Sequence, residues 1–358
     1  MSSSSPIAVR VARKTTEALD ICSLELVAVD GSALPAFSAG SHIDVQLPGG
    51  ITRQYSLCNN ADENHRYVVS VLRDPASRGG SQAVHDLVAE GDQITISAPR
   101  NHFALAHDAK QHLLLAGGIG VTPILCMAER LALTGGDFRM HYCTRSKERT
   151  AFLQHITGAG YADRVAFHFD DGDAAQKLDL AATLTAPRDG VHLYVCGPKG
   201  FMDAVLATAR AQGWPEAQLH YEFFAGVVVA SEDDASFEVQ LASSGKVVRV
   251  PLGKTVVKAL EEAGVEVQVS CEQGVCGTCL TRVLEGEPDH WDMYLTPEEQ
   301  ERWEAHRAAC LFDGQGGART VEQLFAQIDE ISETADDERT QDILGALYDY
   351  AEHIAPER

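Results

Sequence analysis

The strongest signal in the sequence is the stretch Cys271-Glu272-Gln273-Gly274-Val275-Cys276-Gly277-Thr278-Cys279, which places three cysteines within nine residues. A fourth cysteine, Cys310, follows about thirty residues later. Gly274 and Gly277 let the backbone turn tightly, so that N–H groups can point at sulfur. Such a loop is typical of a segment that wraps around a metal cluster.

The spacing of these cysteines indicates the kind of cluster. Cys-x4-Cys-x2-Cys with a distant fourth cysteine is the spacing of a plant-type [2Fe–2S] site. Structural zinc sites usually pair two short Cys-x-x-Cys units or use histidine, and neither pattern is present here. A lone late cysteine is also compatible with a buried core residue. We predict a [2Fe–2S] cluster held by Cys271, Cys276, Cys279 and Cys310.

The other cysteines indicate the compartment. Met1–Pro6 is serine-rich and lacks the apolar stretch of a signal peptide. The total of nine is odd, which makes a disulfide framework a poor interpretation. Reduced thiols predict a cytoplasmic protein. The five that remain lie within or beside apolar runs: Cys22, Cys58, Cys126, Cys143 and Cys196.

Length and charge narrow the class of protein. A chain of 358 residues should hold two or three domains, and 45% hydrophobic and 23% charged residues indicate a folded globular protein. Asp and Glu number 52 against 29 Lys and Arg, a formal charge of -23. This excess argues against nucleic acid and anionic membrane partners, because both attract basic patches. No run of about 18 apolar residues is present, so no membrane-spanning helix is expected.

Residues 1–105 alternate in short runs separated by turn residues such as Pro48-Gly49-Gly50. Such runs predict half-buried strands, with one short helix near Ala83–Val88. Many short strands with little helix predict an antiparallel β-barrel. The strands are expected at Ile7–Val11, Ile21–Leu26, His42–Leu47, Tyr67–Val71 and Gly91–Ile96.

In residues 106–226 the spacing of the apolar residues changes. A continuous apolar strand is expected at His112–Ala116 and further buried strands at Phe138–Cys143 and Val191–Cys196, and they alternate with helix-like segments such as Pro123–Leu133. Alternation of buried strands with helices predicts a parallel, doubly wound α/β sheet.

A linker, 227–235, is expected before a third domain, 236–318. Ser244-Gly245 stands between two strand-like runs and predicts a hairpin. Thr255–Ala263 then predicts a capped helix that ends at Gly264. The cysteine stretch follows this helix.

Residues 319–358 form an acidic tail. From Leu311 to Arg358 there are 12 acidic and 3 basic residues, a net charge of -9. The tail is compatible with an amphipathic helix pair that packs on its own domain, and also with a docking element for a protein partner. Its apolar residues keep helical spacing: Val321, Leu324, Phe325, Ile328, Ile343, Leu344, Leu347 and Tyr348.

A glycine-rich loop follows the first buried strand of the second block. Its sequence, Gly117-Gly118-Ile119-Gly120-Val121-Thr122-Pro123, opens a helix, where backbone N–H groups can meet a pyrophosphate. Cys196-Gly197-Pro198 ends a later buried strand, and a second strand end must face the nicotinamide. A glycine-rich turn alone is a weak signal, and Cys196 alone is compatible with an inert core residue. Together they predict a nucleotide site.

A second set of residues lies in the barrel region. Arg53-Gln54-Tyr55-Ser56 offers a guanidinium fork for a phosphate and a flat phenol face for an isoalloxazine ring. Gly79-Gly80-Ser81 precedes the short helix and is suited to complete a phosphate cradle. Each motif alone is more often an ordinary turn or surface feature, whereas their combination and order predict a flavin site.

The order of barrel, nucleotide domain and cysteine domain resembles the phthalate dioxygenase reductase and vanillate demethylase reductase family. These are the flavin and iron–sulfur reductases that serve Rieske oxygenases. The resemblance covers about Val9 to Cys310 and rests on three independent motif sets. It implies a multidomain α+β and α/β fold, with an antiparallel β-barrel flavin domain, a parallel-sheet nucleotide domain and a β-grasp plant-type ferredoxin domain.

The resemblance also implies roles for individual residues. The Arg53-x-Tyr55-Ser56 motif matches the one that binds flavin mononucleotide (FMN), and the choice of FMN over the dinucleotide rests on the family resemblance. Thr122 is expected near the flavin, and Cys196 and Thr122 are the candidates for the reaction centre. Asp171 resembles a residue on the adenosine side, and Asp289–Glu299 looks like the segment before the last cysteine. The remaining matches are Gly80 and Ser81 in the second phosphate turn, Gly117, Gly118, Gly120, Thr122 and Pro123 in the NADH loop, and Cys196, Gly197, Pro198 and Phe224, within Glu222-Phe223-Phe224, around the nicotinamide and flavin.

The implied reaction carries electrons from NADH through FMN and the [2Fe–2S] cluster to a Rieske-type oxygenase. The oxygenase would hydroxylate or O-demethylate an aromatic acid. No side chain is required as a general acid or base in the hydride step. The choice between NADH and NADPH stays open on the residues. Arg145 and Lys147 follow a strand whose end usually contacts the ribose 2′ group, and their charges suit the 2′-phosphate of NADPH. The resemblance implies NADH.

The sequence departs from the family after Cys310. Family members usually end there with a short apolar strand, whereas this chain continues with residues 311–317 and the acidic tail. Two other hypotheses stay open. A reductase for another acceptor, such as a cytochrome monooxygenase or a carnitine-type oxygenase, would keep every motif. A ferredoxin-type carrier or redox sensor would need only the cysteine cluster.

Overall fold

The computed structural model describes residues 6–75, 77–224, 236–265, 267, 269, 279, 281, 283 and 284. The described part of residues 4–280 belongs to one compact unit. Three of the predicted cluster ligands, Cys271, Cys276 and Cys310, lie outside the described residues. So do the predicted linker 227–235, the segment Asp289–Glu299 and the acidic tail. Within the described ranges, every helix is too short or too polar to cross a bilayer.

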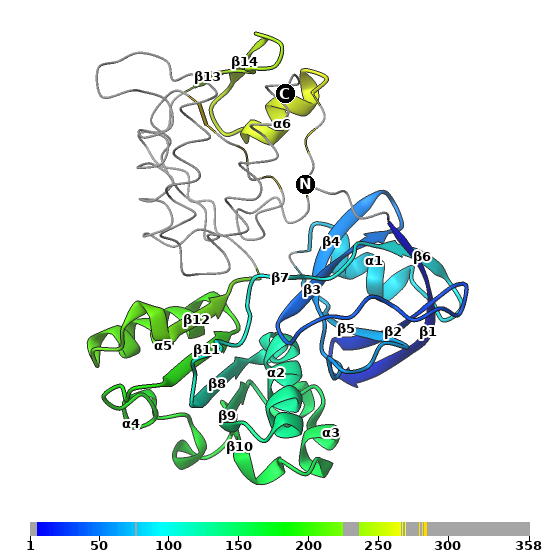
Figure 1. The fold of residues 1–358 in the computed structure, drawn as a ribbon. Coiled ribbons are helices and arrows are strands. Elements are labelled where there is room, and N and C mark those ends of the chain that lie inside the picture. Colours follow the sequence, from blue (N-terminus) through cyan, green and yellow to red (C-terminus); the bar gives the residue numbers. More distant parts are fainter. Residues whose placement is uncertain are drawn as a thin grey trace, which may run out of the picture. The chain divides into compact units, whose positions relative to one another are not determined.

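An antiparallel seven-stranded sheet forms the first part of the chain (Figure 1). Its order is β4-β3-β6-β1-β2-β5, with β7 paired to β3. A bridge between Leu57 and Val69 joins the chain after β4 to β5, so the sheet closes on itself as the predicted barrel. The strands are β1 (Ile7–Ala18), β2 (Ile21–Ala28), β3 (Ser41–Leu47), β4 (Ile51–Ser56), β5 (Tyr67–Leu72), β6 (Gln93–Ile96) and β7 (Arg100–Asn101).

Alternation of side chains along these strands makes the barrel core. In β1, Val9 and Val11 are buried while Ala8 and Arg10 face outward. The strand runs to Ala18, farther than the predicted Ile7–Val11, because two irregular registers let it keep pairing with β2. Apolar residues from every long strand meet in this core: Val9, Val11, Leu24, Leu26, Ile43, Val45, Tyr67, Val69 and Ile96.

One short helix, α1 (Gly80–Asp86), lies beside the barrel strands. It begins three residues before the predicted helix, because Gly79 takes a left-handed conformation (φ 87°) that turns the chain into the first helical residue. Lys14 Nζ, from β1, donates hydrogen bonds of 2.7–2.9 Å to the carbonyls of Val84, His85 and Val88. The last turn of the helix is thus capped by a lysine from a neighbouring strand.

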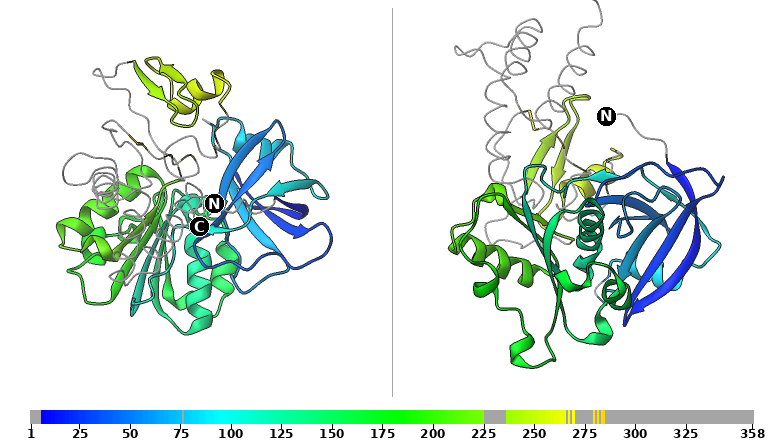
Figure 2. Two further views of the ribbon diagram at one scale, coloured as in Figure 1. Left: turned by 45° about the horizontal axis from the view of Figure 1, so that its top comes forward. Right: turned by 60° about the horizontal axis from the view of Figure 1, so that its bottom comes forward.

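A five-stranded parallel sheet follows, in the order β10-β9-β8-β11-β12. This is the predicted doubly wound arrangement, with its switch point between β8 and β11. Figure 2 shows helices on both faces of this sheet. The strands are β8 (Gln111–Gly117), β9 (Asp137–Thr144), β10 (Val165–Phe169), β11 (Val191–Cys196) and β12 (Leu219–Glu222); the helices are α2 (Val121–Thr134), α3 (Leu153–Gly158), α4 (Leu180–Thr183) and α5 (Lys199–Ala211).

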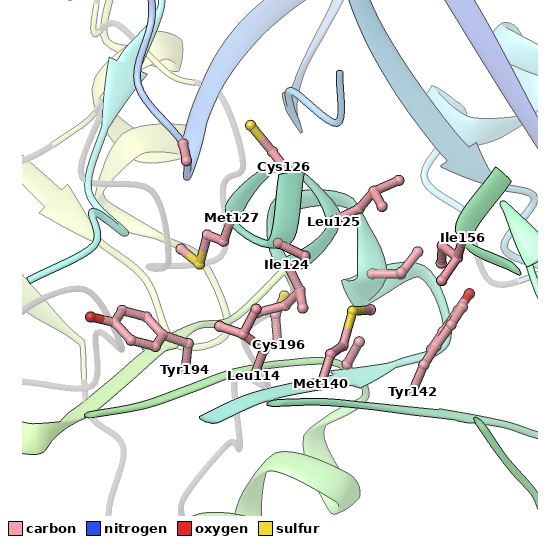
Figure 3. Packing of buried hydrophobic residues seen from close by; sticks show 14 of the residues in the cluster. Leu114, Ile124, Leu125, Cys126, Met127, Met140, Tyr142, Ile156, Tyr194 and Cys196 are labelled. Atoms are coloured by element: carbon pink, nitrogen blue, oxygen red, sulfur yellow. The ribbon is translucent and has the colours of Figure 1, made fainter. Parts of the chain in front are cut away.

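Each face of the parallel sheet has its own apolar core. On one face, Ile124 and Leu125 of α2 pack over Leu114, Met140 and Tyr142 (Figure 3). On the other face, Met202 and Val205 of α5 pack against β8 and β11. Because β11 is covered on both sides, all six of its residues are buried, which explains why all of them except His192 are hydrophobic.

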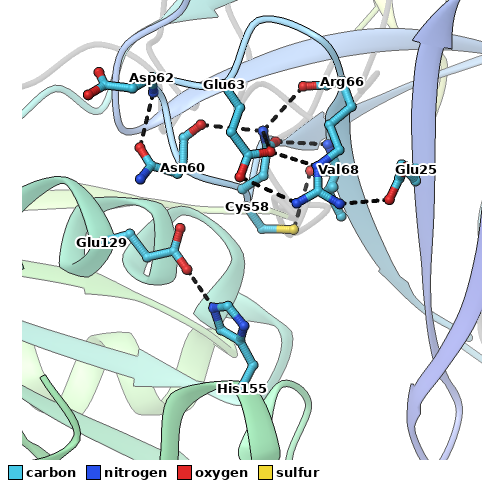
Figure 4. Close-up of polar contacts among 10 residues, drawn as sticks. Glu25, Cys58, Asn60, Asp62, Glu63, Arg66, Val68, Glu129 and His155 are labelled. Atoms are coloured by element: carbon cyan, nitrogen blue, oxygen red, sulfur yellow. Dashed lines mark hydrogen bonds and ion pairs between the residues drawn. The ribbon is translucent and has the colours of Figure 1, made fainter. Parts of the chain in front are cut away.

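Ion pairs connect the barrel with the parallel-sheet domain. Arg130 of α2 lies 2.6 Å from Asp62, in the loop after β4, and Arg149 lies 3.0 Å from Asp20. Figure 4 shows Asp62 in its loop, and Glu129 of α2 bonded to His155 of α3. Cys126 of α2 also points away from the sheet in Figure 3.

The third described part is a hairpin with one helix. β13 (Phe237–Gln240) and β14 (Val247–Val250) pair antiparallel, as predicted from Ser244-Gly245. The side chain of Thr255 accepts a hydrogen bond from Lys258 N and caps α6 (Val256–Glu262), and Gly264 follows the helix with φ 75°. Val248 and Val250 pack against Ala259 and Leu260.

Candidate functional site

The predicted phosphate-binding residues of the barrel lie in contact with each other. Arg53 on β4 donates to the carbonyls of Thr52 (2.7 Å) and Arg78 (3.1 Å), and these bonds hold its side chain across the start of α1. A Cβ on Gly80 would lie 2.7 Å from Arg53 Cγ, so a larger residue at this position would force the arginine side chain to shift. Ser81 accepts a hydrogen bond from Asp74 N (3.1 Å). The guanidinium and the first amides of α1 therefore gather in one place.

Tyr55 lies two residues beyond Arg53, on the same side of β4. Its ring packs partly against the barrel core. Burial raises the pKa of its phenol, which stays neutral at physiological pH. The residue combines a fixed ring with a neutral hydroxyl, as the sequence interpretation requires of a group beside a flavin.

Ser56 faces the other way and connects the barrel to the parallel sheet. Its Oγ donates a hydrogen bond of 3.1 Å to Oε2 of Glu222, the last residue of β12. The other carboxylate oxygen of Glu222 lies 3.8 Å from Nδ1 of His42, the residue paired with Ser56 across β3 and β4. Three polar side chains from both sheets thus meet at one buried point.

Burial decides the charge state of this cluster. It raises the pKa of Glu222 to about 7, with the Ser56 hydrogen bond acting in the opposite direction. Burial lowers the pKa of His42 to about 3, assisted by the nearby His102 and Arg100. His42 is 2% exposed, and neither of its ring nitrogens has a hydrogen-bond partner among the described residues. A neutral imidazole and a carboxyl poised between its two states lie side by side.

The two predicted nucleotide loops fit closely together at the end of the parallel sheet. A Cβ on Gly120 would lie 2.3 Å from the carbonyl oxygen of Cys196, and one on Gly197 would lie 2.9 Å from Cα of Gly117. A Cβ on Gly117 would meet Pro198 Cδ at 2.9 Å. Only glycine allows the backbones to approach this closely. The pattern of glycines therefore has a geometric cause, at the switch point where α/β sheets bind ligands.

Side chains inside these loops hold the loops in shape. Thr122 is 2% exposed and donates a hydrogen bond of 3.1 Å to the carbonyl of Ile119. Pro123 lies in the first turn of α2, where a backbone N–H has no acceptor within the helix, so the missing N–H of proline costs no hydrogen bond. Gly118 has φ 54°, which suits a residue without Cβ. Cys196 is fully buried, and burial, with Glu222 nearby, raises its thiol pKa well above the usual value.

Asp171 is placed at the same edge of the sheet, one strand farther out. Its N–H donates to the carbonyl of Arg145 (3.2 Å), which joins the segment after β10 to the segment after β9. Asp171, Arg145 and Lys147 are all exposed. An anionic and two cationic side chains therefore occupy the position where a ribose 2′ group would be read.

Two further predictions concern the ends of the described chain. Phe224 is 39% exposed, directly after β12 and Phe223, so its ring is open to a planar partner. Of the four predicted cluster ligands, only Cys279 is a described residue, and it is half-buried. The geometry of the cluster site as a whole therefore lies outside the described residues.

Sequence reasoning missed the buried polar cluster. Glu222 was noticed only as part of a matching segment, and His42 only as part of a strand. The signal for Glu222 was a carboxylate at the end of a parallel strand, the edge at which doubly wound folds bind ligands. For His42 no local signal exists, because its neighbours come from β4, β7 and β12.

Family models match three parts of the chain. Residues 239–312 match the 2Fe-2S iron-sulfur cluster binding domain, a range that contains all four predicted ligands. Residues 93–219 match the N-terminal domain of dimethylamine monooxygenase subunit DmmA-like proteins. Residues 289–354 match the exonuclease I C-terminal domain, overlapping the first match over 289–312.

Curated relatives match most of the chain. A vanillate O-demethylase oxidoreductase from Pseudomonas putida is 56% identical over 81% of this chain and 91% of its own length. The corresponding protein of Acinetobacter baylyi is 44% identical over 78% of this chain and 87% of its own. The phthalate dioxygenase reductase of Burkholderia cepacia is 39% identical over 81% and 90%.

Solved structures agree with the fold. The structure of a phthalate dioxygenase reductase, described as modular for electron transfer from pyridine nucleotides to [2Fe–2S], covers 82% of this chain and 92% of its own, with 38% identity and a TM-score of 0.67. An intact type IV self-sufficient cytochrome P450 monooxygenase matches 83% of this chain with 38% of its own, at 38% identity and a TM-score of 0.74. The predicted multidomain fold class is confirmed.

Proposed function

The chain belongs to the vanillate O-demethylase oxidoreductase and phthalate dioxygenase reductase family, and from this premise we propose that it supplies electrons to an oxygenase that O-demethylates a methoxylated aromatic acid. The family consists of reductase components of oxygenase systems, with a pyridine nucleotide as electron donor and a [2Fe–2S] domain. The chain is therefore an oxidoreductase whose protein partner is an oxygenase.

One observation carries the finer choice of partner. Identity is 56% and 52% to the oxidoreductases of two vanillate O-demethylases, against 39% to the phthalate enzymes, over a similar share of the chain. A reductase must match the surface of its oxygenase. Greater likeness over the whole chain supports a vanillate-type partner rather than a phthalate-type one.

The described residues fit an FMN in the barrel. Arg53 and the amides at Gly80 and Ser81 would hold the phosphate; the absence of a Cβ on Gly80 leaves room for the arginine, which is held by the carbonyls of Thr52 and Arg78. Tyr55 would pack against the ring system, and Phe224 is exposed for the same purpose. When bound, the flavin supplies the conversion between two-electron hydride chemistry and the one-electron chemistry of an iron–sulfur cluster.

The interlocked loops fit a dinucleotide. The backbone N–H groups at the starts of α2 and α5 would bind the pyrophosphate. The chain enters α2 through Gly117, Gly118, Gly120 and Pro123, and it enters α5 through Gly197 and Pro198. Cys196 and Thr122 are both buried and would support the loops of this site from beneath. In this proposal they act by position, because neither buried group is free to exchange a proton with solvent.

The polar cluster would control protons beside the reacting rings. Glu222 takes up or releases a proton near neutral pH, and Ser56 orients its carboxyl by donating to Oε2. His42 stays neutral and so offers an accepting nitrogen toward Glu222. These side chains exclude water from the boundary between the two sheets.

Asp171 would favour NADH over NADPH. Its carboxylate would accept hydrogen bonds from ribose hydroxyls and repel a 2′-phosphate. Arg145 and Lys147 act in the opposite sense, so replacing Asp171 should reveal their charge. We also propose that the four cysteines Cys271, Cys276, Cys279 and Cys310 hold the cluster, that the domains divide as 1–105, 106–226 and 236–318, and that the protein works in the cytoplasm.

Reconstitution with purified oxygenase components tests the proposal. The protein, NADH and a vanillate oxygenase should consume vanillate at least about tenfold faster than the same protein consumes phthalate with a phthalate oxygenase. A control without reductase sets the background. Equal or higher rates with the phthalate oxygenase, or with a cytochrome P450 acceptor, would contradict the choice of partner.

A further inference from the structure

The segment that carries Asp171 is closed at its base by a histidine. His168, the fourth residue of β10, lies with its Nδ1 2.7 Å from the carbonyl oxygen of Gln176. Between these two residues the chain leaves the sheet, passes Asp171 and returns through a short 3-10 turn, Ala174–Gln176. A single side chain thus joins the two ends of the loop 168–176.

The direction of this hydrogen bond is fixed by chemistry. A carbonyl oxygen only accepts, so Nδ1 of His168 must carry the proton and donate it. In a neutral ring Nε2 is then an acceptor, and Nδ1 of His141 on β9 lies 3.0 Å from it. Burial, with His168 and Arg139 nearby, lowers the pKa of His141 to about 4, so His141 is a neutral donor.

The interior of the loop is shaped around the same closure. A Cβ on Gly172 would lie 2.3 Å from Oε1 of Gln176, so the amide side chain crosses the loop where a glycine leaves room. Gly172 N donates to the carbonyl of Phe169 (3.2 Å), and Gln176 N donates to Asp173 (2.8 Å). These bonds lie within the loop. The N–H groups of Asp170 and Asp171 join the first part of the loop to the carbonyls of Thr144 and Arg145, and the His168 bond joins its far end to β10.

We propose that His168 is a positioning residue for the nucleotide, because it closes the loop 168–176 and so holds Asp171 where the adenosine ribose of NADH would bind. This inference rests on the role proposed above for Asp171. Closure of the loop should therefore affect binding of the adenosine half of NADH and leave binding of the nicotinamide half unchanged. The nicotinamide loops around Gly120 and Cys196 belong to other strands, β8 and β11.

The histidine has two near-isosteric replacements that separate its two nitrogens. In His168→Asn the amide nitrogen stands at the position of Nδ1, so the bond to Gln176 can be kept. In His168→Gln the amide reaches as far as Nε2 instead, so the loop bond is lost while a polar group remains beside His141. His155→Ala is a matched control, because it removes another hydrogen-bonded histidine of the same domain, at α3.

The measurement is flavin reduction with two donors, NADH and reduced nicotinamide mononucleotide, which lacks the adenosine half. We expect His168→Gln to raise KM for NADH by about three- to tenfold, the size of one lost hydrogen bond, with kcat unchanged. KM for the mononucleotide should not change. His168→Asn and His155→Ala should behave as the wild type with both donors.

Each other result has a definite meaning. An unchanged KM for NADH in His168→Gln, or an equal loss with both donors, would overturn the positioning role. Asp171→Ala separates that failure from failure of the proposed site. If Asp171→Ala raises KM for NADH alone while His168→Gln does not, the site stands and the inference falls. If neither variant affects NADH more than the mononucleotide, both are wrong.

Discussion

The hydroxyl of Ser56, on the last residue of a barrel strand, donates a 3.1 Å hydrogen bond to Glu222, on the last residue of a parallel strand 166 positions later. The carboxyl is buried, and the imidazole of His42 lies on its other side. A group with a pKa of about 7 at this point makes the boundary between the two sheets sensitive to pH.

Glu222→Gln should make the folded protein less sensitive to pH. Because burial raises the pKa of Glu222 from 4.5 to about 7, the unfolded carboxyl ionises first as pH rises. Wild-type stability should therefore fall between about pH 4.5 and pH 7 by on the order of 3 kcal/mol and then level off. The glutamine variant should lack this decrease. Denaturant unfolding from pH 5 to pH 8 measures it, and parallel curves for the two proteins would contradict the assignment.

Gly120→Ala should separate the two nucleotide loops. The new Cβ would lie 2.3 Å from the carbonyl oxygen of Cys196. This oxygen belongs to the backbone, so it cannot move away by a change of rotamer. We expect a loss of about 1–3 kcal/mol in stability and a large rise in KM for NADH. Gly158→Ala, in α3, meets no atom within 4 Å and is the control. Stopped-flow reduction by NADH and thermal unfolding decide the result, and an unaltered KM in Gly120→Ala would be inconsistent with interlocked loops.

Arg53→Ala should weaken flavin binding. The guanidinium is held across Gly80 by the carbonyls of Thr52 and Arg78, so it is oriented before any ligand arrives. Loss of a charge-assisted contact to phosphate should raise the dissociation constant for FMN at least about tenfold. Arg13→Ala is the control, because it removes an arginine whose Nε donates to Thr15 at the surface. Quenching of FMN fluorescence by apoprotein measures both, and equal affinities would remove Arg53 from the site.

Cys276→Ser should divide the two halves of the electron path. NADH should still bleach the flavin, because the residues proposed to bind FMN and NADH lie in the barrel and the parallel sheet. Reduction of cytochrome c, a one-electron acceptor, should stop. Cys143→Ser is the control, because Cys143 lies on β9 of the parallel sheet. Cytochrome c reduction at the wild-type rate in Cys276→Ser would contradict a relay through the cysteine cluster.

The sequence was sufficient where local pattern and structure coincide. The alternation along β1 and β3, the mostly hydrophobic sequence of β11 and the cap at Thr255 each predicted the element that is found. Boundaries were harder to predict. β1 extends to Ala18 only because β2 offers a partner through two irregular registers, and such pairing is a property of both strands.

The motifs of the candidate site could be predicted from the sequence, whereas the contacts between its residues could not. Gly117, Gly120 and Gly197 are visible as glycines, but their cause is the approach of two backbones about 80 positions apart. The Ser56, His42 and Glu222 cluster depends on closure of the barrel and on where β12 ends. Neither condition is written in any single stretch of sequence.

The most direct test of the account is an anaerobic titration of the purified protein with NADH, followed by visible absorbance and low-temperature EPR, with the flavin identified after denaturation. We predict released FMN, bleaching of the flavin absorbance, and a rhombic EPR signal from a reduced [2Fe–2S] cluster. Flavin bleaching without a cluster signal would contradict the central claim, because the chain would then be a flavin reductase with no route to an oxygenase.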